Sequence, residues 1–280
     1  MINLKIIVCC HKDDIYKRSK IFLPIHVGKA LSDKDFGIIG DDTGENISSK
    51  NASYCELTGM YWAWKNLKGV DYIGLCHYRR YFDFNRIGRK FFPLSTIKTE
   101  RFSDLNLDIC PKAEKWLKNK GCIIAKPSHQ HASLFTHYCE WHYSTDFKIL
   151  GDIIKKTLPK KYFKAFIDTQ IKSNRLSPYN MFIMNWETFD KYCCWLFPIL
   201  KEVEDKTNIT FYTPYQKRVY GYMAERLLNL FVKVEKLKLM KIPVLKISDE
   251  PETDDMPVVR YMIRSFLRDI AVKVTAEIPK

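Results

Sequence analysis

The most informative segment of the sequence is Asp71-Tyr-Ile-Gly-Leu-Cys76, followed directly by His77-Tyr-Arg-Arg-Tyr81. The first part predicts a buried β-strand, because its apolar residues form a short continuous run. A cluster of histidine and arginine ends that strand abruptly. In sheets built from strands and helices, ligands bind beyond the carboxyl ends of the strands, where loops and helix N-termini meet. The stretch therefore predicts an α/β fold with a cationic binding edge at residues 77–81.

Other segments continue this pattern in both directions along the chain. Further strands are expected at Leu4–Cys9, Gly121–Ala125 and Tyr179–Met184. Helices are expected at about Tyr54–Asn66, from an N-cap at Asn185 towards Glu204, and over Tyr215–Leu230. Strands that alternate with helices indicate a sheet with mixed or parallel strands, flanked by helices.

Length and composition exclude several classes of protein. The chain has 280 residues, of which 46% are hydrophobic, so it can bury a full core and is not expected to be disordered. Apolar stretches such as Tyr192–Leu200 are far shorter than the roughly 20 residues that cross a bilayer. The N-terminus does not read as a secretory signal. We expect a cytosolic globular protein with one large domain, or one domain and a small appendage.

Neither the cysteines nor the histidines have the spacing of a metal site. No C-x-x-C occurs among the nine cysteines, and buried reduced thiols are expected in preference to disulfides or zinc. Four of the seven histidines gather between His129 and His142, but without an H-E-x-x-H pattern. No metal ligand is therefore assigned there. His142 and Asp146, four residues apart, can instead face one site together.

The formal charge of +14 suggests an anionic partner: nucleic acid, anionic lipid or a phosphorylated substrate. Arg260, Arg264 and Arg268 recur every four residues, with apolar residues between them. This pattern is typical of an amphipathic helix on an anionic membrane surface. The alternative is a docked surface helix with a solvated basic face. No nucleic-acid-binding motif is recognised, so we expect no nucleic acid partner.

Several polar residues could carry chemistry, and each also has a structural reading. His77, Arg79 and Arg80 would suit phosphate oxygens, or the arginines could pair with carboxylates on the surface. The polar loop Gly40–Asn46 could bind a nucleotide or a sugar, or it could be an ordinary turn. Glu56 could be a carboxylate in a site, or the glutamate of a capping box, since Ser53-x-x-Glu56 has that spacing. Glu225 could serve as a general base or as an ion-pair partner.

Taken together, longer strings resemble a known family. They are Gly40-Asp-Asp-Thr-Gly-Glu-Asn-Ile-Ser48, Tyr54-Cys-Glu-Leu-Thr-Gly-Met-Tyr-Trp-Ala-Trp-Lys-Asn66, Tyr72-Ile-Gly-Leu-Cys-His-Tyr-Arg-Arg-Tyr-Phe82, Tyr179-Asn-Met-Phe-Ile-Met184, Trp195-Leu-Phe-Pro-Ile-Leu200 and Gly221-Tyr-Met-Ala-Glu-Arg-Leu-Leu-Asn229. The chain resembles bacterial capsule and O-antigen biosynthesis proteins long filed as a domain of unknown function, some of which are galactofuranosyltransferases. The resemblance implies a GT-A-like, Rossmann-type glycosyltransferase domain at residues 1–231. A basic, helical segment at 232–280 would pack on the domain or on a membrane.

The resemblance also bears on metal dependence. Ordinary GT-A enzymes carry an Asp-x-Asp after the strand that corresponds to Asp71–Cys76, and it holds Mg²⁺ or Mn²⁺ on the diphosphate. Here His77-Tyr78-Arg79 takes that place, and Asp33-Lys-Asp35 follows no hydrophobic strand. We therefore expect cationic side chains to substitute for the metal. Asp83 is the alternative ligand if a metal is retained.

Site residues are assigned by analogy with that family. The residues assigned to the nucleotide-sugar donor are His11, Lys12, His77, Tyr78, Arg79, Arg80 and Asn180. Glu225 is the first choice for the catalytic base, with Asp41 and Asp42 as the second. The residues assigned to the acceptor are His142, Asp146 and Arg226.

The expected reaction is transfer of a hexose, galactofuranose or galactose, from a UDP-sugar with inversion at the sugar carbon. The acceptor would be a glycan or an undecaprenyl-linked oligosaccharide of capsule or lipopolysaccharide O-antigen. The enzyme would bind this acceptor in the cytoplasm, at the inner face of the anionic cell membrane. The alternatives are a transferase for another nucleotide sugar and a non-catalytic basic protein that binds membrane or nucleic acid.

Overall fold

The computed structural model describes residues 2–89, 91–250 and 256–275, which group into two compact units. The first unit comprises Met1–Lys126, Tyr179–Cys193 and Lys238–Asp255. The second comprises Pro127–Pro178, Cys194–Leu237 and Met256–Lys280. The boundaries between these units differ from the boundary at residue 231 that was expected from the sequence. The reason is that strands after residue 237 return to the sheet of the first unit.

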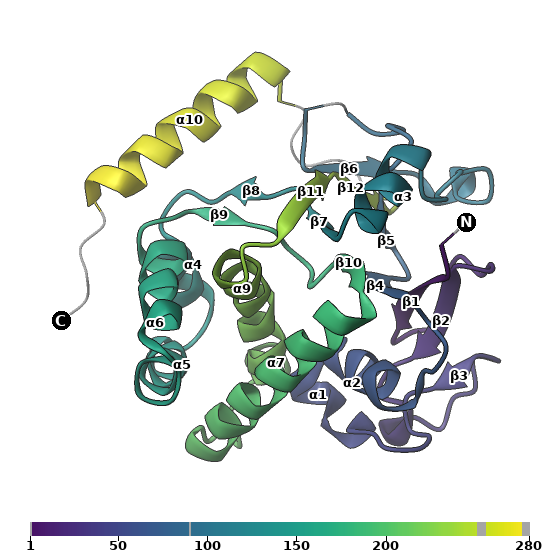
Figure 1. The fold of residues 1–280 in the computed structure, drawn as a ribbon, viewed down its shortest axis with the longest axis horizontal. Helices are drawn as coiled ribbons and strands as arrows, with labels where there is room; N and C mark the ends of the chain where they lie inside the picture. The colour runs from purple at the N-terminus through teal and green to yellow at the C-terminus, as the bar shows by residue number, and fades with distance from the viewer. Residues whose placement is uncertain (1, 90, 251–255, 276–280) are drawn as a thin grey trace. The chain divides into compact units, whose positions relative to one another are not determined.

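The first unit contains a large mixed sheet (Figure 1). Its ten strands in the described residues are β1 (Leu4–Cys10), β2 (Phe22–His26), β3 (Ile39–Gly40), β4 (Tyr72–His77), β5 (Arg80–Phe82), β6 (Leu94–Ile97), β7 (Gly121–Ala125), β10 (Phe182–Asn185), β11 (Lys238–Ile242) and β12 (Val244–Ile247). The main strand order is β11-β7-β10-β4-β1-β2-β3, and β12 joins β5 and β6 beside it. The strands predicted at Leu4–Cys9, Asp71–Cys76 and Gly121–Ala125 are confirmed. The strand predicted at Tyr179–Met184 begins only at Phe182, because Tyr179 and Asn180 have positive φ values.

Strands β1 and β4 lie parallel at the centre of this sheet. Cys9 is in register with His77, so the loops that follow the two strands begin side by side. On the other side of β4, strand β10 runs antiparallel, with Phe182 opposite Leu75. The parallel pair therefore places the segment after residue 77 next to the segment after residue 10.

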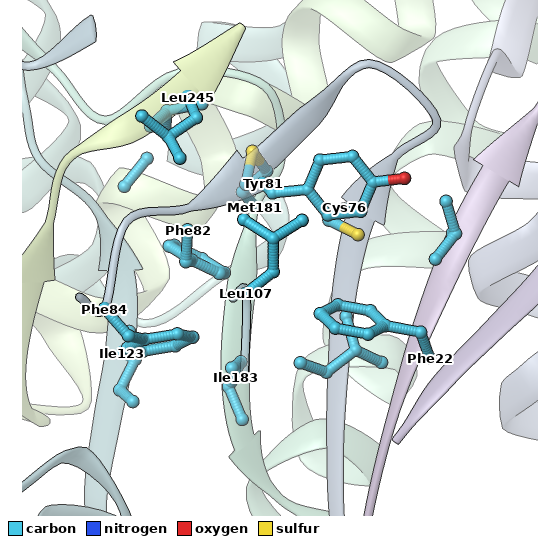
Figure 2. Close-up of a cluster of buried hydrophobic side chains, with 14 of the residues drawn as sticks. Phe22, Cys76, Tyr81, Phe82, Phe84, Leu107, Ile123, Met181, Ile183 and Leu245 are labelled. Carbon is cyan, nitrogen blue, oxygen red and sulfur yellow. The ribbon is translucent and has the colours of Figure 1, made fainter. Parts of the chain in front are cut away.

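One face of the sheet carries a cluster of buried apolar side chains, shown in Figure 2. Ile6 and Val8 of β1 contribute to it, as do Ala113 and Leu117 of helix α3 (Pro111–Lys118). Tyr81 is fully buried in this cluster, and its hydroxyl donates to the carbonyl of Tyr78 at 3.0 Å. The last residue of the His77–Tyr81 motif thus anchors the motif in the core.

On the opposite face of the sheet, helix α2 (Leu57–Asn66) packs against β1 and β2, and it follows the short helix α1 (Asn51–Tyr54). A single helix was expected over Tyr54–Asn66, but Cys55 has φ 52° and separates the two helices. A Cβ atom on Gly59 would lie 2.7 Å from Cγ1 of Val27 and 3.4 Å from Sγ of Cys9. Glycine at this position therefore lets α2 pack closely on β1 and β2.

The second unit consists mainly of helices. They are α4 (Leu134–Trp141), α5 (Ser144–Thr157), α6 (Lys160–Phe166), the π-helical turn Ile167–Ile171, α8 (Pro214–Lys217), α9 (Val219–Val234) and α10 (Val258–Thr275), with the short strand pair β8 (Ser128–His129) and β9 (Arg175–Leu176). Three 3₁₀ turns, at Lys29–Leu31, Ser48–Lys50 and Thr99–Arg101, belong to the first unit. Helix α7 (Trp186–Lys206) begins in the first unit and continues into the second. The predicted N-cap is confirmed, since the backbone N–H of Thr188 donates to Oδ1 of Asn185 at 2.7 Å.

The segment 232–280 is only partly helical, contrary to expectation. Residues Lys238–Ile247 form β11 and β12, because β11 can pair in parallel with β7 and Pro243 cannot continue a helix. The predicted amphipathic helix is present as α10. Within the described residues, no helix has both the length and the apolar character needed to span a bilayer.

Candidate functional site

Polar and aromatic side chains of the first unit gather where β1, β4 and β5 meet the turn before β10. This strand-end cluster consists of His11, Asp14, Glu56, His77, Tyr78, Arg79, Arg80, Tyr179 and Asn180. Six of the seven donor residues predicted from the sequence belong to this cluster: His11 follows β1, His77 ends β4, Tyr78 and Arg79 follow β4, Arg80 begins β5 and Asn180 lies in the turn. The seventh, Lys12, is exposed beside His11. Asp14, Glu56 and Tyr179 were not assigned to the site from the sequence.

Arg79 and Asp14 join the loops that follow β4 and β1. Nη2 of Arg79 lies 3.0 Å from Oδ1 and 2.9 Å from Oδ2 of the Asp14 carboxylate. The hydrogen bond that Arg79 donates to this carboxylate raises the pKa of the guanidinium. The ion pair therefore holds a permanently charged group at the carboxyl edge of the sheet, with 37% of its side chain exposed.

Arg80 lies beside that ion pair without a carboxylate of its own. Its guanidinium lies 4.6 Å from the ring centroid of Tyr179, an arrangement that favours a cation–π interaction. Among the residues that the structure describes, no carboxylate pairs with Arg80, and its buried Nε has no hydrogen-bond partner. Arg80 therefore carries a positive charge that no carboxylate of the described residues pairs with.

The two histidines of the cluster differ in their surroundings. Nε2 of His77 lies 2.8 Å from the carbonyl oxygen of Tyr179, and because a carbonyl only accepts, this nitrogen carries the proton. The ring of His11 meets the ring of Tyr78 edge-on, with centroids 5.2 Å apart. Burial is the main reason that the pKa of Tyr78 is raised. His11 and Lys12 are exposed, and His77 is half-buried.

Tyr179 and Asn180 form a strained turn that leads into β10. Both have positive φ values, 71° and 52°, which few residues other than glycine adopt. Backbone strain of this kind is common at functional sites and persists only where the surroundings hold it. Asn180 is 2% exposed, and its Nδ2 donates to Oε1 of Glu56 at 2.6 Å. The turn therefore brings an amide and a carboxylate to the cluster from positions 124 residues apart.

Ser53 and Glu56 do not take the positions expected for a capping box, because Ser53 lies inside α1 and Glu56 itself precedes α2. The Ser53 hydroxyl donates to the carbonyl of Lys50, and Glu56 begins α2 without a side-chain cap. The carboxylate of Glu56 is directed to Asn180 instead. The Ser53-x-x-Glu56 spacing was misleading because the amide of Asn180, 124 residues away, donates a hydrogen bond to the Glu56 carboxylate.

The loop at Gly40–Asn46 is held together by its own hydrogen bonds. Asp41 is fully buried, and its carboxylate accepts from the backbone N–H groups of Gly28 and Lys29 and from the Ser48 hydroxyl. Nδ2 of Asn46 donates to the carbonyl of Asp42 at 2.9 Å, while Asp42 itself is exposed. Asp41 thus fixes the start of the 3₁₀ turn at Lys29, and of the two carboxylates only that of Asp42 faces solvent.

The carboxylates near the end of β4 are already engaged, which does not fit a divalent cation. Asp83 accepts from the backbone N–H groups of Ile87 and Gly88 at 2.8 and 2.9 Å, and Asp14 pairs with Arg79. Asp35 accepts from the N–H of Gly37 in an exposed loop. Within the described parts of the chain, no three His, Cys, Asp or Glu side chains are grouped so as to hold a metal ion. None of the nine cysteines, all described, forms a disulfide.

Glu225 and Arg226 belong to α9 of the second unit. Arg226 is 3% exposed, its Nη1 donates to the carbonyl of Tyr222 at 3.0 Å, and its guanidinium lies 4.9 Å from the ring centroid of Tyr138. Burial lowers the pKa of Arg226. Oε2 of Glu225 lies 3.8 Å from Nη1 of Arg226, a loose ion pair. Glu225 is half-buried, so this carboxylate keeps some access to solvent.

His142 and Asp146 lie on different elements of the second unit and have different partners. The His142 ring stacks on Tyr222 with centroids 4.1 Å apart, and its Nδ1 lies 3.3 Å from Oε1 of Gln216. Burial lowers the pKa of His142 to about 4. Asp146 is 3% exposed and accepts from the Tyr212 hydroxyl at 3.0 Å, and burial raises its pKa. Asp146 is therefore directed at Tyr212.

Exposed aromatic rings surround His142. Trp141, Tyr143 and Tyr215 are 58%, 46% and 49% exposed. Tyr143 packs on Tyr212 with ring centroids 4.4 Å apart, and the ring of Tyr215 stacks on that of His142 at 5.5 Å. Flat aromatic faces beside a hydrogen-bonding histidine and amide can bind a ligand that has apolar faces and polar edges.

The mixed α/β fold, with a cationic strand-end cluster at its centre, is of the glycosyltransferase type that the sequence predicted. Residues 5–236 match the family described as "Domain of unknown function (DUF4422)", and the chain belongs to that family. The structure is similar to the apo structure of the WbbM bifunctional glycosyltransferase, with a TM-score of 0.79 and 29% sequence identity. The match covers 90% of this chain and 48% of that one, so this chain spans about half of its neighbour's length. No curated protein matches the chain.

Proposed function

We propose that the protein is a glycosyltransferase that moves a hexose from a UDP-sugar to a glycan acceptor during synthesis of a surface polysaccharide. The observation that carries this proposal is the strand-end cluster, where Arg80 has no neutralising carboxylate in the described residues. The likeness to a glycosyltransferase structure supports the same conclusion. A diphosphate bears the negative charge that such a cluster would bind.

On the donor side, Arg80, Arg79 and His77 would contact the diphosphate. Negative charge grows on this group as the bond to the sugar breaks, and fixed cations lower the barrier by stabilising that charge. His11 and Lys12 would approach the nucleotide, and Tyr78 would pack beside it. Asn180 and Glu56 would bind sugar hydroxyls, since an amide and a carboxylate offer both a donor and acceptors.

On the acceptor side, Glu225 would act as the base. It would take the proton from an acceptor hydroxyl, whose oxygen forms the new bond to the sugar carbon as the bond to the diphosphate breaks on the opposite face. Because the new bond forms on the face opposite the leaving diphosphate, the configuration at that carbon is inverted. Asp42 is the remaining second choice, because three donors already occupy the Asp41 carboxylate. Arg226 and His142 would orient the acceptor, with Asp146 supporting Tyr212.

The donor sugar that we propose is galactofuranose or galactose. The acceptor would be a glycan or an undecaprenyl-linked oligosaccharide of capsule or O-antigen, met in the cytoplasm at the anionic face of the cell membrane. The reaction would proceed without a metal held by an Asp-x-Asp, because cationic side chains occupy the corresponding place after β4.

A panel of UDP-, GDP-, TDP- and CMP-sugars, assayed for hydrolysis or transfer with and without EDTA, tests this function. We expect turnover of a UDP-hexose that EDTA does not abolish, and its loss in Arg79→Ala and Glu225→Gln variants. Full activity in the Arg79→Ala variant would remove Arg79 from the diphosphate site. Near-normal turnover in the Glu225→Gln variant would exclude Glu225 as the base. If UDP gives no thermal shift but DNA does, the non-catalytic alternative is favoured.

A further inference from the structure

Helix α10 exposes a continuous apolar face. Seven of its large apolar residues, each between 42% and 81% exposed, recur at spacings of three and four: Val259, Met262, Ile263, Phe266, Leu267, Ile270 and Val274. Such spacing places them along one side of the helix. Contiguous exposed apolar surface of this kind is rare in proteins that act alone in water, and it marks an interaction site.

The helix is attached to its own unit by the opposite, more polar side. Asp269 accepts from Nδ1 of His129 at 2.8 Å and pairs with Arg175, while Nη1 of Arg268 donates to the carbonyl of His129 at 2.9 Å. Ser265 and Val272 are buried at 8% and 3% exposure. Figure 1 shows α10 in yellow beside β8, along the edge of its unit. An amphipathic helix normally buries its apolar side in the core, and α10 does the reverse.

Basic side chains lie near the ends and along one side of the apolar face. Arg260 and Lys273 are exposed near the two ends of the helix, Arg264 is half-buried between them, and the whole chain carries a formal charge of +14. An apolar stripe bordered by Lys and Arg matches the boundary between acyl chains and anionic headgroups in a bilayer. A second copy of the chain would bring like charges against these residues, which opposes association of two α10 faces.

We propose that α10 docks the protein on an anionic lipid bilayer, with Phe266 and its apolar neighbours inserted at the acyl boundary and Arg260 and Lys273 at the headgroups. The contacts of Asp269 and Arg268 with His129 fix the helix so that its apolar face points outward before any membrane is met. This docking goes beyond glycosyl transfer and requires neither a donor nor an acceptor sugar.

Cosedimentation of the full chain with lipid vesicles tests the docking. The protein is expected to bind vesicles of phosphatidylcholine mixed with phosphatidylglycerol, and to bind much less to phosphatidylcholine alone. Phe266→Glu should weaken binding by about tenfold or more, because a charge replaces a large apolar group at the acyl boundary. Phe211→Glu is the matched control, since Phe211 is 92% exposed but lies outside α10, and it should bind like wild type.

The charge contribution is measured separately. Replacing both Arg260 and Lys273 with Gln should weaken binding to the mixed vesicles, by about fivefold for each charge, and added salt should have less effect on this variant. Lys156→Gln, at an exposed lysine of α5, is the control for net charge and should change binding little. Circular dichroism of every variant shows whether it is folded.

Two results would overturn the proposal. The first is that wild type fails to bind the mixed vesicles, or that Phe266→Glu binds them as well as wild type. The second is a dimer of wild type in sedimentation velocity, a monomer of Phe266→Glu, and no vesicle binding by either protein. This result would mean that a second copy of the chain covers the apolar face of α10. Both results are independent of transferase activity.

Discussion

The guanidinium of Arg79 pairs with the carboxylate of Asp14, with nitrogen–oxygen distances of 2.9 and 3.0 Å, and this contact joins the loops that follow β4 and β1. The next residue, Arg80, has no such partner among the described residues and lies on the ring of Tyr179. The two adjacent arginines therefore have different surroundings. In the function that we propose, both would contact the diphosphate, and Arg80 would bring a charge that no carboxylate of the described residues pairs with.

Replacing Arg80 with Gln should weaken UDP binding. The variant loses a charge-assisted contact with phosphate, and a loss of about tenfold to hundredfold in affinity is expected. Isothermal titration calorimetry measures it. Arg101→Gln is the control, because Arg101 is exposed in a 3₁₀ turn of the same unit. Equal losses in the two variants would show that net charge alone matters and that Arg80 has no special place.

Replacing Asn180 with Asp should destabilise the protein in a pH-dependent way. A new carboxylate would face Oε1 of Glu56 in place of the amide, and the repulsion raises the pKa of the pair in the folded state. Stability is then lost as pH rises through the normal carboxyl range, and it is partly regained at lower pH. The loss near neutral pH should be about 1–3 kcal/mol, measured by urea unfolding.

Asn180→Gly is the control for that experiment. Glycine accepts the positive φ of 52° and removes the amide without adding charge. Its loss of stability relative to wild type should therefore not depend on pH. If Asn180→Asp has the same pH dependence as Asn180→Gly, the contact with Glu56 does not govern this turn.

Acid should destabilise the protein through two half-buried histidines, His137 and His142. Burial lowers the pKa values of His137 and His142 to about 4, whereas both are near 6.5 when unfolded. Between those values the unfolded chain binds more protons, so stability falls as pH decreases from about 6.5 to 4. The melting temperature should drop by several degrees over this window, and the drop should be smaller in a His142→Phe variant. An unchanged slope in that variant would contradict the assignment.

Replacing Gly59 with Ala should destabilise the first unit, although alanine normally favours a helix by about 1 kcal/mol. The new Cβ would lie 2.7 Å from Cγ1 of Val27, and overpacking of this kind costs about 1–3 kcal/mol. Urea unfolding measures the change. Adding Val27→Ala removes the clashing group, so the double variant should regain stability relative to the sum of the single changes. A more stable Gly59→Ala variant would show that α2 packs less closely.

Local patterns predicted the central strands, the cap at Asn185 and the cationic edge at residues 77–81, because apolar runs and terminal polar groups are short-range signals. The contacts of Glu56 with Asn180 and of Arg79 with Asp14 were not predictable, since each joins residues far apart in sequence. The periodicity of α10 predicted an amphipathic helix but not which side faces the protein. That choice depends on Asp269 finding His129 and Arg175, which no spacing reveals.

The central claim is that the strand-end cluster binds a diphosphate, and a calorimetric comparison of UDP with uridine tests it most directly. Titrations of wild type and of the Arg80→Gln variant with each ligand separate the diphosphate from the base and ribose. Wild type is expected to bind UDP far more tightly than uridine, and Arg80→Gln is expected to reduce this difference. Equal affinity of wild type for UDP and uridine, or an unchanged difference in the variant, would show that the cluster does not bind the diphosphate.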